Sequence, residues 1–178
     1  MHERDLKGAY NLLVNCGQAC EGERLLLCYE QKNLDFYDNA IVEDVWACAQ
    51  EIGLEVIPYE LDFDPVIDVV PKHLEAAIAA ADLTVFLARL ADQMRFGRFK
   101  SGQRTILSYA LNSASLASPF GTVHYKASLA LKQVIDAAVF GAGEVVVSCK
   151  AGTYFKGRIA ASPDGGDSDL RRFPMLVN

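Results

Sequence analysis

Short apolar runs recur along the chain and predict the strands of a parallel sheet. Residues 24–29 and 83–88 form continuous apolar runs after polar turns, a pattern typical of strands buried on both faces. Residues 54–59 are predicted as a second strand between them, and residues 105–111 are a fourth strand candidate.

Amphipathic segments separate these runs and predict helices. Apolar residues recur at helical spacing within residues 6–16 and within residues 120–140. Asp38 is expected to cap a helix that ends at Gly53, since a carboxylate accepts from the free N–H groups of a first turn and glycine suits the residue after a last turn. Pro71 is expected to open a further helix.

The last third of the chain predicts a β-hairpin followed by a tail. Residues 144–149 are rich in β-branched side chains and predict a strand, and residues 152–159 predict the turn and the returning strand. Residues 162–169 have the Gly, Pro, Asp and Ser content of a linker. The apolar residues 173–177 are expected to dock, either on the chain's own sheet or on a partner.

These patterns predict an α/β fold. We expect a parallel-sheet βαβ domain of about four to five strands flanked by helices, with right-handed crossovers and a C-terminal β-hairpin extension. Residues 1–160 are expected to form this domain, and residues 161–178 a loop and an apolar tail. A chain of 178 residues is long enough to bury one such core.

Composition and charge narrow the classes of function. Hydrophobic residues make up 51% of the chain and charged residues 22%, as in an ordinary globular protein. The net charge of −6 disfavours a nucleic-acid partner. No apolar run has the roughly 18 residues of a membrane span, and the polar residues 1–5 are unlike a signal peptide. A cytoplasmic protein without a membrane partner is expected.

The five cysteines are expected to be free thiols, because their number is odd and no secretion signal precedes them. Cys28 and Cys149 lie in apolar strand-like runs and Cys48 lies on a helical pattern, so all three are expected to be buried. Cys16 and Cys20 lack a second ligand pair. No metal site is expected from these two cysteines and the three histidines, His2, His73 and His124.

A basic segment interleaved with aromatic residues is the candidate binding site. It follows the third predicted strand and reverses the charge of an acidic chain. Guanidinium groups bind carboxylates in bidentate pairs, and ligands of open α/β sheets gather at the carboxyl ends of the strands. The alternative is a solvated loop whose charges pair with surface acids. The candidate ligand-binding residues are Arg89, Arg95, Phe96, Arg98, Phe99, Lys100 and Arg104.

Motifs of nucleophilic or cofactor chemistry do not accompany this segment. The chain has no G-x-S-x-G elbow and no G-x-G-x-x-G turn after its first strand. Gly141 and Gly143 end a predicted helix instead of opening one, which is the wrong place for a phosphate group. Catalysis by this chain alone is not expected, and neither a catalytic residue nor a cofactor is assigned.

Four short segments carry a resemblance. They are residues 20–27 (CEGERLLL), 80–85 (AADLTV), 102–104 (GQR) and 145–153 (VVVSCKAGT). In their order and spacing they resemble the N-terminal domain of the thermophilic metallo-aminopeptidases of the aminopeptidase T type, a family that includes 2,5-dihydroxypyridine dioxygenase. The segments span most of the chain, and the last of them is the most specific.

The resemblance implies the fold of that domain and descent from a metallohydrolase-like ancestor. In the family the metal ligands lie in a C-terminal domain, and no residue here matches them because the sequence is expected to end before that domain. The family's Asp two residues after its Gly-Thr turn is also absent, since Thr153 is followed by Tyr154 and Phe155. The resemblance carries over the fold and no catalytic residue.

The function expected from the sequence is a non-catalytic binding module derived from a metallopeptidase-like domain, with a peptide as its ligand. A precursor peptide presented to modifying enzymes in a biosynthetic pathway would be such a ligand. Two alternatives stay open. One is the substrate-binding half of a metal-dependent aminopeptidase or dioxygenase whose catalytic domain is on another chain or absent. The other is a structural homodimer formed through the C-terminal hairpin and tail.

Overall fold

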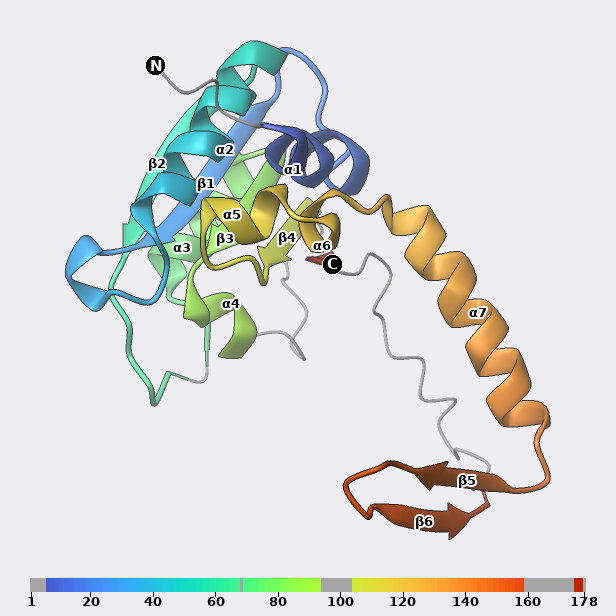
Figure 1. The fold of residues 1–178 in the computed structure, drawn as a ribbon. Coiled ribbons are helices and arrows are strands. Elements are labelled where there is room, and N and C mark those ends of the chain that lie inside the picture. The colour runs from blue at the N-terminus through green and yellow to red at the C-terminus, as the bar shows by residue number, and fades with distance from the viewer. Residues whose placement is uncertain (1–5, 68, 94–103, 159–174, 178) are drawn as a thin grey trace.

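A parallel β-sheet forms the centre of the molecule. The computed structural model describes residues 6–67, 69–93, 104–158 and 175–177. Within these residues the chain forms one five-stranded and one two-stranded sheet (Figure 1). The parallel strands of the larger sheet are β1 (Arg24–Glu30), β2 (Glu55–Leu61), β3 (Leu83–Leu87) and β4 (Arg104–Ser108). The predicted parallel-sheet α/β fold is therefore confirmed.

The strand order reverses between β1 and β3. The five strands lie in the order β2-β1-β3-β4-β7. The chain passes from β1 to β2 on one side and then crosses back to β3 on the other side of β1. In open α/β sheets, the crevice beyond the carboxyl ends of two such strands is the usual place for a ligand. The residues that follow β1 and β3 therefore set the candidate site.

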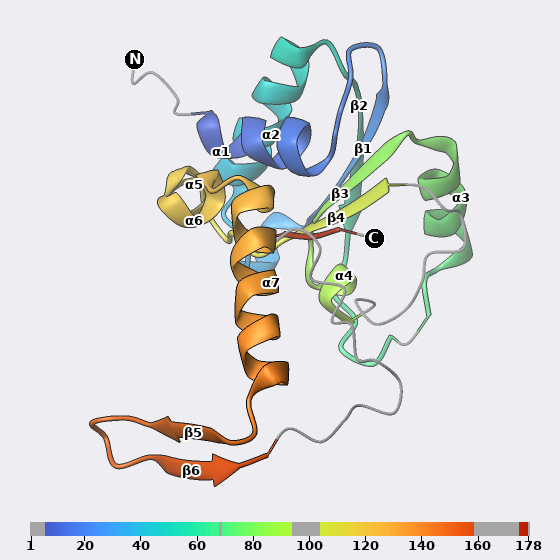
Figure 2. The same cartoon turned by 90° about the vertical axis from the view of Figure 1, so that its right-hand side faces the viewer.

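Helices cover both faces of this sheet (Figures 1 and 2). Leu25 and Leu27 of β1 pack into a core with one group of helices, and Leu26 packs into a second core on the opposite face, because successive strand residues point to opposite faces. The first group comprises α1 (Lys7–Tyr10), the π-helical turn η1 (Asn11–Cys16), α2 (Asn39–Ile52), α5 (Ser113–Ala117) and α6 (Pro119–Thr122). The second comprises α3 (Lys72–Ala80) and α4 (Arg89–Gln93), and a 3₁₀ turn, η2 (Lys32–Leu34), follows β1.

Local capping chemistry defines the longer helices as predicted. Asp38 Oδ1 accepts from the N–H of Ala40 at 3.0 Å, and Gly53 ends α2 with φ of +84°. Pro71 directly precedes α3. The sequence pattern does not predict α4, α5 and α6, because a helix of four or five residues has too few apolar repeats to show a period. None of the helices in the described part of the chain combines the length and apolar character that a membrane crossing requires.

The last strand of the sheet comes from the C-terminal tail. β7 (Met175–Val177) pairs antiparallel with β4, with Val177 opposite Ile106. The sequence predicts that the apolar tail docks either on the chain's own sheet or on a partner. In the structure it docks on the chain's own sheet. Part of residues 161–178, which the sequence pattern assigns to a loop and tail, thus supplies the fifth strand.

An arm formed by residues 125–158 projects from this domain. It consists of α7 (Tyr125–Gly141) and the predicted hairpin, in which β5 (Val145–Ser148) pairs antiparallel with β6 (Tyr154–Gly157). Figures 1 and 2 agree that α7 leads away from the sheet and that the hairpin lies at its far end. The helix predicted over residues 120–140 is interrupted, because Val123 is extended between α6 and α7. No residue of α7, all of which is described, is buried.

Asn11 fastens the base of the arm to the domain. Its side chain is buried, and Nδ2 donates to the carbonyl oxygens of Gly121 at 2.7 Å and Val123 at 3.0 Å. Its Oδ1 accepts from Asn15 Nδ2 at 2.9 Å. A single side chain thus satisfies two carbonyl groups of the segment that leads into α7.

Asn11→Ala should lower the free energy of unfolding by about 2 kcal/mol, because it leaves those two carbonyl groups without a donor. Asn15→Ala is the matched control and should cost less than about 1 kcal/mol, since it removes one hydrogen bond of a half-buried residue. Urea denaturation followed by circular dichroism measures both. Equal losses in the two variants would contradict this role of Asn11.

Candidate functional site

A buried ion pair lies at the carboxyl ends of β1 and β3. Glu30 is the last residue of β1 and its side chain is 3% exposed, whereas the Arg89 side chain, at the start of α4, is 24% exposed. Arg89 Nη2 donates to Glu30 Oε2 at 2.8 Å, and the backbone N–H of Arg89 donates to Oε1 at 2.6 Å. Arg89 Nε lies 3.0 and 3.1 Å from the two carboxylate oxygens. The pair connects the two strands where the strand order reverses.

Two phenylalanine rings enclose the guanidinium group of this pair. Arg89 Cζ lies 3.7 Å from the ring centroid of Phe63 and 4.5 Å from that of Phe36. Phe63 follows β2 and Phe36 follows β1, so three strand ends contribute to the cluster. Each such cation–π contact contributes roughly 0.5–2 kcal/mol. By excluding water, the rings also strengthen the ion pair between them.

Tyrosine side chains extend this cluster toward β4. The hydroxyl of Tyr37 donates to the carbonyl oxygen of Ser108 at 3.1 Å, and the hydroxyl of Tyr109 donates to Asp92 at 3.3 Å. Burial raises the pKa of Tyr37 well above its ordinary value, so its hydroxyl stays protonated and keeps this bond at neutral pH. Gln93 Oε1 is buried without a hydrogen-bond partner among the described residues.

The structure separates the two described members of the predicted basic site. Arg104 pairs in register with Leu83, which places it at the amino ends of β3 and β4, whereas Arg89 follows the carboxyl end of β3. A connection between two parallel strands has to cross from one end of the sheet to the other, so its first and last residues cannot share one site. The remaining candidates, Arg95, Phe96, Arg98, Phe99 and Lys100, lie outside the described residues.

Arg104 holds together the loops at the amino ends of the strands. Its Nη1 donates to the carbonyl oxygens of Gly17 at 3.0 Å and Gln18 at 2.6 Å, and its Nη2 pairs with Glu23 Oε1 at 2.6 Å. The hydrogen bond from Arg104 lowers the pKa of Glu23, because it stabilises the charged carboxylate. In the described part of the chain, the guanidinium of Arg104 thus serves the protein's own groups.

The cysteines are all free thiols, as predicted, and they differ in exposure. Cys28 and Cys48 are buried as expected, and burial raises the pKa of Cys48 to about 11. The prediction that Cys149 is buried is wrong: it is exposed in the turn that follows β5. A strand of a two-stranded sheet has no helix layer over it, so its apolar sequence does not imply burial.

Histidine side chains of the described residues have local partners. His73 stacks on Tyr59 with ring centroids 6.3 Å apart, and His124 caps α7 by accepting from the N–H of Lys126 at Nδ1, 3.1 Å. Within residues 6–67, 69–93, 104–158 and 175–177, no three His, Cys, Asp or Glu side chains gather as metal ligands.

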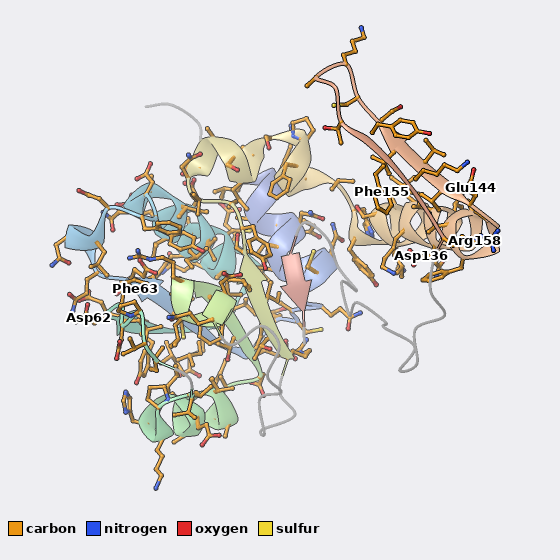
Figure 3. All side chains as sticks on the ribbon, turned by 90° about the horizontal axis from the view of Figure 1, so that it is seen from below. Asp62, Phe63, Asp136, Glu144, Phe155 and Arg158 are labelled. Atoms are coloured by element: carbon orange, nitrogen blue, oxygen red, sulfur yellow. The ribbon has the colours of Figure 1, made fainter. Side chains whose placement is uncertain are left out.

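The arm exposes a large apolar surface. Figure 3 shows Asp136, Glu144, Phe155 and Arg158 together on the arm, far from Phe63 on the domain. Monomeric proteins rarely expose apolar patches beyond a few hundred Å² without a function for them. Eight large apolar side chains of the arm are half exposed or more: Leu131, Val134, Ile135, Phe140, Val146, Val147, Tyr154 and Phe155. The sequence pattern predicts that these positions are apolar, but it does not indicate whether another element of the structure covers them.

The hairpin has open backbone edges among the described residues. The N–H of Cys149 donates to the carbonyl oxygen of Thr153 at 3.0 Å, and Gly152 has φ of +95°, as in a three-residue hairpin loop. Hydrogen-bonded pairs alternate along an antiparallel ladder. With Val147 opposite Phe155, this places the N–H and C=O groups of Val146 on the outer edge of β5.

Comparison with known proteins gives a fold-level likeness. No family model and no curated protein matches the chain. The structure of 2,5-dihydroxypyridine dioxygenase from Pseudomonas putida KT2440 is similar at 18% identity and a TM-score of 0.54. The match covers 87% of this chain and 47% of that one, so the chain spans about half the length of the dioxygenase. A fatty acid ABC transporter substrate-binding protein from Thermomonospora curvata also matches, at 20% identity and a TM-score of 0.41, over 67% of this chain and 31% of its own. The likeness to the dioxygenase is one of fold alone.

Arg89→Met should lower the free energy of unfolding by about 3 kcal/mol, because it leaves the buried Glu30 carboxylate without its cation. The double variant Glu30→Leu with Arg89→Met should recover most of that loss, since no charge remains buried. Arg24→Met is the control: its pair with Asp82 is exposed and should be worth less than about 1 kcal/mol. Urea denaturation measures all three, and purely additive losses at Glu30 and Arg89 would contradict the coupling.

Cys149 should be an accessible thiol whose reactivity depends on Thr153. The side-chain hydrogen bond with Thr153 lowers the pKa of Cys149, and the thiolate is the nucleophilic form. In Thr153→Val, the pH midpoint of alkylation by iodoacetamide should therefore move upward at Cys149. Mass spectrometry of the alkylated peptides measures the rate at each cysteine, with the buried Cys28 and Cys48 as unreactive controls. An unchanged midpoint in Thr153→Val would count against the hydrogen bond.

Proposed function

We propose that this chain is a non-catalytic binding module that takes an extended peptide onto the outer edge of β5. The open edge of the hairpin is the observation that carries this proposal. In strand addition, main-chain hydrogen bonds supply affinity, and contacts with alternate side chains supply specificity. The outward N–H and C=O groups of Val146 can form such main-chain hydrogen bonds with an added peptide.

The side chains of the two edges favour β5 over β6. Val145, Val146 and Val147 present apolar groups on both faces of β5 and carry no charge. The edge of β6 carries Lys156, which pairs with Glu144 at 2.9 Å. Natural sheets use lysine on edge strands to prevent pairing with another chain. A peptide with alternating apolar residues is therefore the proposed ligand class for β5.

The position of the hairpin fits a module that presents its ligand. The hairpin lies at the far end of α7, away from the sheet of the domain (Figures 1 and 2). A peptide added to β5 would keep its own outer edge and most of its side chains accessible. We propose on this basis that the ligand is a precursor peptide held for a modifying enzyme.

The ion pair at the switch point supports a structural role for the crevice within the domain. Both oxygens of the Glu30 carboxylate accept hydrogen bonds from Arg89. The two rings on the guanidinium occupy its faces. The basic residues Arg95, Arg98 and Lys100 stay a separate prediction of the sequence for acidic groups of a ligand.

The fold likeness favours a second candidate function. The chain resembles in fold about half of a dioxygenase, so it is alternatively the substrate-binding half of a metal-dependent dioxygenase or aminopeptidase. The described residues do not supply a ligand set for the metal, which would have to be held elsewhere. Stoichiometric binding of Fe²⁺ or Mn²⁺ to the isolated chain, measured by calorimetry, would favour this function over the first.

Val146→Pro should weaken peptide binding at least about tenfold while leaving the hairpin intact, because proline removes an N–H that faces outward. Lys156→Pro is the matched control on the outer edge of β6 and should leave the affinity within about twofold. Fluorescence polarisation of labelled peptides, selected from an array of apolar-alternating decapeptides, measures both variants. The proposal fails if no peptide of the array binds, or if Val146→Pro binds as the parent chain does.

A further inference from the structure

We propose that α7 is a dimerisation helix, which pairs antiparallel with α7 of a second copy of this chain. The inference goes beyond the proposed peptide binding, and it rests on the exposed face of α7 instead of the edge of β5. It differs from the alternative of a homodimer formed through the C-terminal hairpin and tail, since the tail strand β7 is paired within its own sheet.

The exposed face of α7 has the spacing of a helix–helix seam. Ala127, Leu131, Val134 and Ala138 follow one another at intervals of four, three and four residues. This spacing keeps apolar residues on one side of a helix and is the repeat by which two helices interdigitate. All four residues are exposed, with Leu131 62% and Val134 68% exposed. Helices of this pattern normally bury the seam, whereas here the described residues leave Leu131 and Val134 exposed.

The seam is symmetric about its own midpoint, and this property selects a second copy as the occupant. In an antiparallel pair centred between Lys132 and Gln133, Leu131 faces Val134 of the other copy, and Ala127 faces Ala138 of the other copy. A two-fold contact requires such self-complementarity, because residue i meets residue j and j meets i. Large side chains thus meet in the middle, and small side chains at both ends allow close approach of the helices.

The flanking positions obey the same symmetry. Ile135, which is 51% exposed, lies on one side of the seam, and Ala130 lies on the other side. The two-fold operation that pairs Leu131 with Val134 keeps each flank on its own side. It therefore brings the two copies of Ile135 together on one flank and the two copies of Ala130 together on the other, and both flanks of the contact are apolar.

Charged residues of α7 lie away from the seam. At 3.6 residues per turn, Lys126, Lys132 and Asp136 are rotated by roughly 110° or more from its centre. Lys132 and Asp136 form an ion pair with each other on that side. The proposed contact would therefore bury no charged group. The pattern is the reverse of a solvated surface helix, since the apolar side is exposed while Lys132 and Asp136 are half-buried.

The available area reaches the lower limit for a specific dimer. α7 has 17 residues and is about 25 Å long, so antiparallel pairing places each hairpin beside the base of the other copy's arm. Phe120 and Tyr10 are exposed near that base. Leu131, Val134 and Ile135 then enter the contact together with one face of the hairpin, Val147 and Phe155, because successive strand residues point to opposite faces. At roughly 100 Å² of exposed surface each, these five side chains of both copies bury about 1,000 Å² in total, the lower limit of a specific interface.

Sedimentation equilibrium of the full chain tests this proposal. Over a hundredfold range of concentration, the mass should rise to twice the chain mass of 19.5 kDa. Leu131→Glu should weaken the dimer by at least about tenfold, because it buries a charge on the seam. Gln133→Glu adds the same charge to the same helix away from the seam and should leave the mass unchanged. Circular dichroism is expected to be the same for all three proteins, since Leu131 is exposed.

A charge pair on the seam determines the direction of the two helices. The double variant Leu131→Lys with Val134→Glu should regain the dimer that Leu131→Lys alone loses, because the antiparallel arrangement places the introduced lysine of one copy against the introduced glutamate of the other. A parallel pair would place like charges together and would not be rescued. A monomer at all concentrations, or a dimer that Leu131→Glu does not weaken, would overturn the proposal. Either result leaves the peptide site on β5 untouched, so the two proposals fail separately.

Discussion

A carboxylate buried at the end of a strand requires a cation, and this requirement organises the sheet of the present protein. Glu30 ends β1 inside the domain, and Arg89 meets it from the first turn after β3. The backbone N–H of Arg89 joins the same carboxylate, so the start of α4 is fixed together with the side chain. Phe36 and Phe63 then close over the guanidinium, which draws the segments after β1 and β2 onto the same point. One ion pair thus ties together the carboxyl ends of three strands.

Because the ion pair and the two rings fill the crevice at the switch point, a ligand is expected to bind elsewhere. In many α/β domains the crevice at the switch point is open to a ligand, whereas here the protein's own charge pair and two aromatic rings occupy it. The arm has the opposite character, because its helix buries no residue and the described residues leave both edges of its hairpin open. The two proposals use different parts of that arm. The face of α7 suits a second copy, and the edge of β5 suits a peptide, so both can be occupied together.

The fold follows from the sequence more directly than the site does. Parallel strands and capped helices leave local signals, such as the apolar run of β1 and the Asp38 and Gly53 that delimit α2. The site is built from Glu30, Phe36, Phe63 and Arg89, which no local pattern connects. An acidic residue at the end of a buried run was the available signal, because such a group needs a partner. Residues that are neighbours in the sequence are conversely separated by the sheet, as with Arg89 and Arg104.

Amide hydrogen exchange of the full chain tests most directly whether the domain is a closed scaffold and the arm the part that binds. Exchange is followed by mass spectrometry at low and high protein concentration, with and without a pool of apolar-alternating peptides. We expect slower exchange in α7 as the concentration rises, slower exchange in β5 with peptide, and no change in β1 and β3. Protection after Glu30 and around Arg89, with unchanged exchange in the arm, would show instead that the crevice and not the arm is the binding surface.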